Sequence, residues 1–144
     1  MCIRDRPIYH DTEYNASAHP TDAQMEAIYA LADAATTRAQ VEALTDTSFA
    51  EAYTKLICLM HQQYPNAEVV MVIGDWVPSG TLWVIQHIAN HYAGKWGYKC
   101  VNLQDISGFQ TYNVIPKESG CHPNEAGFEV MANYIYQKVG SYID

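Results

Sequence analysis

The chain has few basic residues and no long apolar run. Its 144 residues include eight Lys and Arg against sixteen Asp and Glu, which gives a formal charge of −8. A protein that binds a phosphate backbone needs clustered Lys and Arg, so the composition argues against nucleic acid as a partner. No apolar stretch approaches the roughly 20 residues that cross a bilayer, so we expect no membrane span. Neither absence specifies a compartment.

The four cysteines are scattered and do not form the framework typical of small disulfide-bonded proteins. Cys58 is expected on the apolar side of a helix and Cys100 in a strand, where both would be buried thiols. Cys121 precedes a histidine, but adjacent residues rarely direct their side chains at each other. A nucleophilic thiol is therefore not expected.

No histidine pair has the spacing of a metal site. His87 and His91 are four residues apart, yet the zinc-binding helical pattern requires glutamate after the first histidine, and this chain has Ile88. His10 and His19 lie in a polar stretch whose spacing matches no known site. We therefore expect these histidines to lie on the surface, and we expect no metal.

Hydrophobic periodicity predicts alternating helices and strands. Capping boxes at Thr21-x-x-Gln24 and Ser48-x-x-Glu51 predict helices from Thr21 to about Ala43 and from Ser48 through Gln63. Strands are expected over 68–73 and 98–103, and helices over 79–92 and 125–142. The apolar run of the first strand, without alternation, is typical of a parallel strand covered on both faces. The order of elements indicates an α/β layered sheet with right-handed crossovers.

Three of these helices have an apolar face that is expected to be buried. The expected faces are Met25, Ile28, Tyr29, Ala32 and Ala35 in the first helix, Phe49, Ala52, Tyr53, Leu56, Ile57 and Met60 in the second, and Phe128, Met131, Ala132, Ile135 and Val139 in the last. Two parallel strands do not make a stable sheet alone, so we expect further strands to pair with them.

One histidine stands on a predicted turn directly before the last helix. The segment reads Ser-Gly-Cys-His-Pro-Asn-Glu-Ala-Gly over residues 119–127. Pro123 disfavours the α conformation for His122, and Asn124 can cap the helix that follows. An imidazole in such a turn is exposed and titrates near neutral pH.

The string His-Pro-Asn-x-x-Gly before an amphipathic helix resembles the last conserved block of the SGNH (GDSL-type) hydrolases, a family of esterases and lipases. The resemblance covers roughly two thirds of the chain, from about Ser48 to the end. It implies the C-terminal half of a flavodoxin-like three-layer α/β sandwich with a parallel sheet. Residues 7–144 would be a partial domain, with a loop and helix over 7–47 and the core over 48–144.

The resemblance implies a role for each residue of this block. The family's histidine is the general base of a catalytic triad, so His122 is the candidate catalytic base. The family's aspartate usually lies three residues earlier, where this chain has Ser119. A hydroxyl can hold the imidazole tautomer but brings no charge. Glu118 and Asp105 are the nearest carboxylates by sequence that could replace the aspartate.

The implied activity is hydrolysis of a carboxylic ester, on a small molecule or an acylated glycan, without a metal or organic cofactor. In the family a loop at the position of this N-terminal stretch lines the substrate cleft, which makes Tyr9 and Tyr14 candidates for contact with substrate. The nucleophile block has no match. Trp76 stands where serine would follow Gly74 and Asp75, and we interpret that segment as a turn at the end of a strand.

The start of the chain predicts that a part of the domain is missing. Residues 1–6, Met-Cys-Ile-Arg-Asp-Arg, resemble the translated end of a transposon adaptor used in sequencing libraries. We expect the N-terminal half of the domain, with the nucleophile, to be encoded upstream, and the 144-residue chain to be inactive alone. The alternative is a non-catalytic carbohydrate-binding relative of the same fold, in which Ser119 marks the loss of catalysis.

Overall fold

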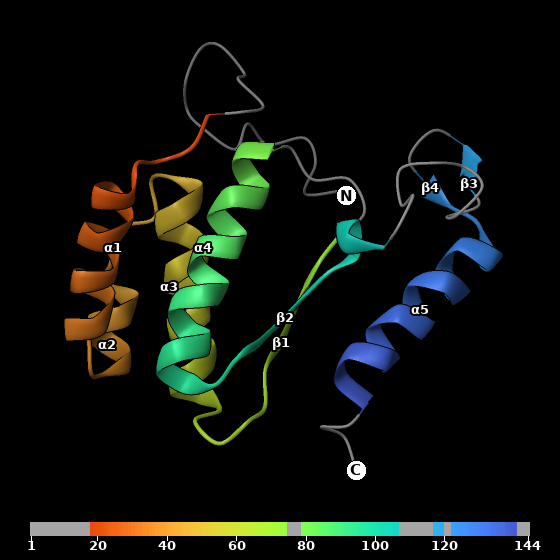
Figure 1. Ribbon diagram of the computed structural model, residues 1–144. Coiled ribbons are helices and arrows are strands. Elements are labelled where there is room, and N and C mark those ends of the chain that lie inside the picture. Colours follow the sequence, from red (N-terminus) through yellow and green to blue (C-terminus); the bar gives the residue numbers. More distant parts are fainter. Residues whose placement is uncertain (1–17, 75–78, 107–116, 120–121, 141–144) are drawn as a thin grey trace. The chain divides into compact units, whose positions relative to one another are not determined.

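The computed structural model describes residues 18–74, 79–106, 117–119 and 122–140 (Figure 1). Helices make up most of these residues. The elements are α1 (Asp22–Ala34), α2 (Arg38–Glu42), α3 (Phe49–Gln63), β1 (Val70–Ile73), α4 (Ser79–Trp96), β2 (Lys99–Asn102), the 3₁₀ turn η2 (Leu103–Asp105), β3 (Lys117–Ser119), β4 (His122–Pro123) and α5 (Glu125–Val139).

The chain divides into two compact units. The described residues of the first, the helical unit, are 18–68 and 79–88. Those of the second, the sheet unit, are 69–74, 89–106, 117–119 and 122–140. Together they have a mixed α/β architecture with a two-stranded parallel sheet. Within these residues, no helix combines the length and apolarity needed to cross a membrane.

The first predicted helix is in fact two helices. α1 ends at Ala34, and α2 begins after Thr37, whose backbone is extended (φ −117°, ψ 155°). The Gln40 N–H donates to Thr37 Oγ1 over 3.3 Å, and the Thr37 N–H donates to the Gln40 side chain over 3.0 Å. The prediction of one helix to Ala43 is wrong. The capping box at Thr37 holds this threonine outside a helical conformation, so the segment forms two helices.

The helical unit packs α1 and α2 against α3. α1 buries Met25, Tyr29 and Ala32, which confirms these three residues of its predicted face. The Ser48 capping box starts α3 as predicted, and α3 ends at Gln63. Cys58 is buried on α3, as expected.

α3 buries a different face from the one predicted. Its buried residues are Ala50, Thr54, Ile57 and Cys58. Leu56 and Met60 are 49% and 37% exposed, and Ala52 is exposed. Only Ile57 of the predicted face is fully buried. Because α3 carries apolar residues on two sides, periodicity alone does not select the side that meets α1 and α2.

The sheet unit is built on the parallel pair β1 and β2, in which Val70 lies opposite Lys99 and Ile73 opposite Asn102. Met71 and Ile73 are buried, but Val72 is 46% exposed. The expectation that both faces of the first strand are covered is therefore wrong at Val72.

α5 packs on this sheet through Val139, which joins Val101 and Leu103 in one core cluster. The residues packed against that cluster are Val70, Ile106, Val130, Met131, Tyr134 and Ile135. Phe128 is 59% exposed and Ala132 is exposed, so the predicted α5 face is wrong at these two positions. The observed face is rotated toward Val130 and Tyr134.

The turn between α4 and β2 is made by Gly97. Its φ of +73° is the left-handed conformation that glycine adopts without strain, and its N–H donates to the Ala93 carbonyl over 3.0 Å. The helix predicted over 79–92 is too short, since α4 continues to Trp96.

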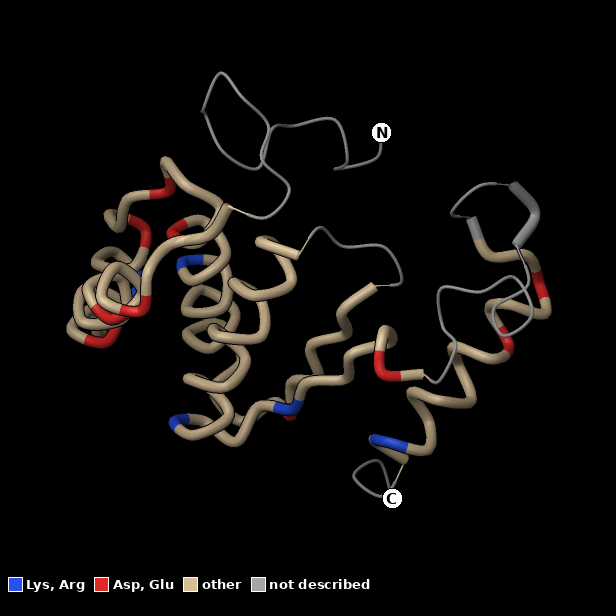
Figure 2. Tube along the Cα trace, turned by 45° about the horizontal axis from the view of Figure 1, so that its top comes forward, with Lys and Arg blue, Asp and Glu red and all other residues tan. Residues whose placement is uncertain are grey.

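Basic side chains are sparse along the described chain. Figure 2 shows Lys and Arg at isolated positions and Asp and Glu at more of them. No stripe of basic residues is visible along the described helices, which agrees with the composition.

Candidate functional site

The candidate base lies in a hairpin that the sequence did not predict. β3 and β4 pair antiparallel, with Ser119 opposite His122 and Lys117 opposite Pro123. The two residues between the strands, Gly120 and Cys121, lie outside the described residues, as do the side chains of Ser119 and His122. The backbone at His122 is extended, as the following proline requires.

α5 begins directly after this hairpin with the predicted cap. Asn124 has non-helical dihedrals (φ −86°, ψ −174°), and its Oδ1 accepts a hydrogen bond from the Gly127 N–H over 3.0 Å. The Phe128 N–H donates to the Asn124 carbonyl over 2.9 Å. Gly127 is buried. The Asn-x-x-Gly part of the string thus fixes the junction between β4 and α5.

Polar side chains gather where β2 ends. Asn102 Oδ1 accepts from the Gln104 N–H over 3.0 Å, and Asn102 Nδ2 donates to Asp105 Oδ1 over 3.2 Å. Gln104 Nε2 is buried and has no hydrogen-bond partner among the described residues. Ligands of open parallel sheets bind beyond the carboxyl ends of the strands, and Gln104 follows the carboxyl end of β2.

The same helix contacts both parts of the candidate site. α5 contacts η2, which carries Gln104 and Asp105, and it also contacts β4, which carries His122. Sequence patterns do not single out Gln104, because the burial of its amide is visible only in the folded chain.

Asp105, one of the two candidate carboxylates, is exposed and held by Asn102. The pKa of the Cys100 thiol is raised, first by partial burial and then by the negative charge of Asp105. Cys100 itself is exposed, so its predicted burial is wrong. Alternation along β2 directs Val101, not Cys100, into the core. Nothing is described for the side chain of the other candidate, Glu118.

Both candidate substrate contacts, Tyr9 and Tyr14, lie outside the described residues. The segment that follows Gly74, with Asp75 and Trp76, does so too. The structure does not test the roles predicted for these residues.

The helical unit contains a polar and aromatic cluster that sequence reasoning missed. Tyr29 Oη lies 2.8 Å from His87 Nδ1, and His87 Nε2 lies 3.6 Å from Asp22 Oδ1. The Trp83 ring stacks on His19 at 4.1 Å between ring centroids and lies 4.8 Å from the His87 ring. His87, expected on the surface, is half-buried and bonded to a buried tyrosine.

Burial disfavours the ionised form of this cluster's tyrosine. Desolvation raises the pKa of Tyr29 well above its ordinary value of 10.0, and the negative charges of Glu26 and Asp33 raise it further. A phenol is neutral at pH 7 even at the ordinary pKa, so Tyr29 contacts His87 in its neutral form, and the shift extends that form to more alkaline pH. In the described parts of the chain, no three His, Cys, Asp or Glu side chains are arranged to hold a metal ion.

Comparison of the chain with models of known protein families, with curated proteins and with solved structures finds no match. Function must therefore be argued from the residues themselves.

Proposed function

We propose that the chain is the C-terminal part of a serine ester hydrolase of the SGNH type, in which His122 is the general base. The observation that carries this proposal is the capped junction between β4 and α5. An extended His-Pro pair leads directly into a helix that Asn124 caps through the Gly127 N–H. The residues that give the string its resemblance are also the residues that form this junction.

The element order gives further support. β1, α4 and β2 form a parallel strand–helix–strand unit, and α5 packs on the sheet. This arrangement is the one expected for the last two strands and the last helix of a flavodoxin-like sandwich. Because a two-stranded sheet is small for a stable domain, we assign the remaining strands and the nucleophilic serine to a segment outside residues 1–144.

The proposed reaction is acyl transfer in two steps. The serine oxygen attacks the ester carbonyl while His122 takes its proton, and the imidazolium then protonates the departing alkoxide. Water next attacks the acyl-enzyme with His122 again acting as base. Donors near the carboxyl ends of the strands would stabilise the oxyanion, and Gln104 Nε2 is a candidate because no described residue bonds to it.

The third position of the triad is occupied by Ser119, where the family usually has aspartate. Ser119 is paired with His122 across the hairpin, so it is in register to orient the histidine without supplying charge. The substitution Ser119→Asp would supply that charge. The carbohydrate-binding alternative is favoured by this same serine, and in it Tyr9 and Tyr14 contact a glycan.

Labelling with a fluorophosphonate, which reacts with activated serines, tests the proposal. The probe is applied to the protein translated together with its upstream coding sequence, to the 144-residue chain, and to a His122→Ala variant of the longer protein. We expect label on the longer protein only, with strong loss in the variant. His61→Gln, on α3 in the helical unit, is the matched control and should label normally. Absence of label from the longer protein, together with binding to a glycan, would favour the carbohydrate-binding alternative.

A further inference from the structure

α3 carries a second apolar face, which the folded helical unit leaves at the surface. Leu56 is 49% exposed and Met60 is 37% exposed. The residues that share this side of α3 by helical spacing, called the outer face below, are Phe49, Ala52, Tyr53, Leu56, Leu59, Met60 and Gln63. Large apolar side chains gathered at the surface on one side of a helix mark a site of contact with another molecule.

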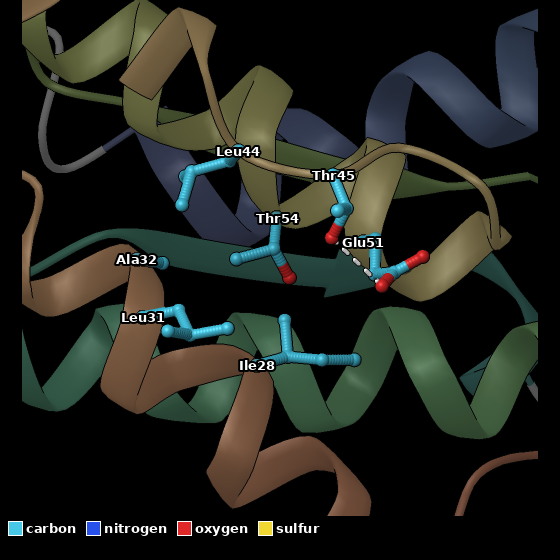
Figure 3. A pocket seen from close by; sticks show the side chains of 7 residues that line it. All are labelled: Ile28, Leu31, Ala32, Leu44, Thr45, Glu51 and Thr54. Carbon is cyan, nitrogen blue, oxygen red and sulfur yellow. Dashed lines mark hydrogen bonds between the residues drawn. The ribbon is translucent and has the colours of Figure 1, made fainter. Parts of the chain in front are cut away.

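The other side of α3 already packs within the helical unit. Thr54 and Ile57 are buried there. Figure 3 shows Glu51 and Thr54 on the side of α3 that meets Ile28 and Leu31 of α1. The contacts that hold α3 in its unit therefore do not use the outer face.

The outer face has no charged side chain. Among Asp, Glu, Lys and Arg, α3 contains only Glu51 and Lys55. The Glu51 carboxylate accepts from the Thr45 hydroxyl over 2.9 Å, and Lys55 Nζ lies 3.1 Å from Asp46 Oδ2 and donates to the Leu44 carbonyl over 2.9 Å. Both charges are thus held by the segment before α3. The core of a protein interface is likewise poor in charge and rich in aromatic residues and Met.

The outer face is also symmetric about its central residue. Ala52 and Met60 lie four residues before and after Leu56, and Phe49 and Gln63 lie seven before and after it. In two antiparallel copies of α3 that cross at Leu56, Ala52 would therefore lie opposite Met60 of the second copy. A two-fold interface requires a surface that is complementary to itself, and a small side chain opposite a large one allows close packing.

We propose that the outer face of α3 pairs with the same face of a second copy of the chain, antiparallel and with both Leu56 side chains at the two-fold axis. Each copy has a formal charge of −8, so contact through a face without charge keeps like charges apart. The 15 residues of α3 span about 22 Å. This is a small interface, so we expect a dissociation constant on the order of 10 to 100 μM. The dimer does not depend on the proposed hydrolase activity.

Sedimentation equilibrium of the 144-residue chain over about 5 to 500 μM tests the dimer. Leu56→Glu places two like charges at the axis and should weaken dimerisation at least about tenfold. Leu31→Glu is the matched control, because Leu31 is a 63% exposed leucine of α1 and does not belong to the outer face. Its dissociation constant should stay within about twofold of the wild-type value.

An exchange of charges tests the antiparallel register. Ala52→Glu and Met60→Lys, both at exposed positions, should each weaken dimerisation. An equimolar mixture of the two variants should dimerise at least about fivefold more tightly than either variant alone, because the new carboxylate lies opposite the new ammonium group. A parallel pair would place Ala52 beside Ala52 of the second copy and would give no such gain.

Four results would each overturn the proposal. They are a chain that stays monomeric over the whole concentration range, equal weakening by Leu56→Glu and Leu31→Glu, a mixture that dimerises no more tightly than its components, and a dimer that is lost when the chain is translated together with its upstream coding sequence. The last result would assign the outer face to the upstream segment. If Leu56→Glu does not fold, the mixture of the other two variants decides.

Discussion

At the scale of single residues, Glu51 is the clearest example of a side chain whose surroundings fix its charge. Burial alone would raise the pKa of its carboxyl group. Hydrogen bonds from Thr47, Thr45 and Ser48 outweigh that effect and lower the pKa from 4.5 to about 2. The carboxylate is therefore stabilised in the folded chain relative to the unfolded chain.

This shift predicts a pH-dependent contribution to stability. Because the folded pKa of Glu51 is lowered, the contribution is present above the unfolded pKa of 4.5 and is lost as the pH falls toward 2. With discounting for solvent screening at a partly exposed site, we expect about 1 to 2 kcal/mol.

Urea unfolding of the wild-type chain and of Glu51→Gln, compared at neutral and acid pH, measures this contribution. The difference in free energy of unfolding between the two chains should be largest at neutral pH and should shrink as the pH falls below about 4.5. A difference that stays constant with pH would show that hydrogen bonds to Glu51 do not depend on its charge.

At the scale of elements, α3 shows how tertiary contacts select among local possibilities. Its start at Ser48 follows from a capping box that the sequence contains in full. Its buried face does not follow from the sequence, since Leu56 and Ile57 are neighbours of similar apolarity. In the folded chain α3 packs against α1 and α2, and there Ile57 is buried while Leu56 is half exposed.

Matched substitutions on α3 test this orientation. Ile57→Ala should destabilise the chain by about 2 to 4 kcal/mol, because it leaves a cavity in the helical unit. Leu56→Ala should cost less than about 1 kcal/mol, because its side chain already contacts water. Chemical denaturation of both variants measures the difference. If Leu56→Ala were the more damaging variant, the face predicted from periodicity would be the buried one.

The start of α5 gives a second prediction at this scale. Asn124→Ala removes the acceptor for the Gly127 N–H and should cost about 1 kcal/mol of stability. Asn124→Asp keeps an acceptor and adds negative charge at the helix N-terminus, so it should cost much less. Thermal unfolding followed by circular dichroism compares them, and equal losses in both variants would mean that the cap is not what stabilises the junction.

The parts of the site that were predictable are those that local chemistry determines. The extended His122-Pro123 backbone and the Asn124 cap depend on neighbouring residues, and both are found in the structure. The unpaired Gln104 amide and the unpaired Thr54 hydroxyl depend on burial between elements distant in sequence. The exposure of Cys100 depends on which face of β2 meets α5, and periodicity did not determine it.

At the scale of the whole molecule, the proposed reaction needs residues from the 144-residue chain and from a segment outside it. The chain supplies a candidate base at the β4–α5 junction and polar groups where β2 ends. We propose that its nucleophile lies in a segment outside residues 1–144. A carboxylic ester hydrolase with this division should be inactive as the 144-residue chain and active when the segment is joined to it.

The most direct test of this account is kcat/KM for p-nitrophenyl acetate, measured on the protein translated together with its upstream coding sequence. We predict that His122→Ala lowers kcat/KM by at least about 10³-fold, while His61→Gln leaves it within about twofold, because His122 alone acts as the base. Hydrolysis that His122→Ala leaves unchanged would contradict the account.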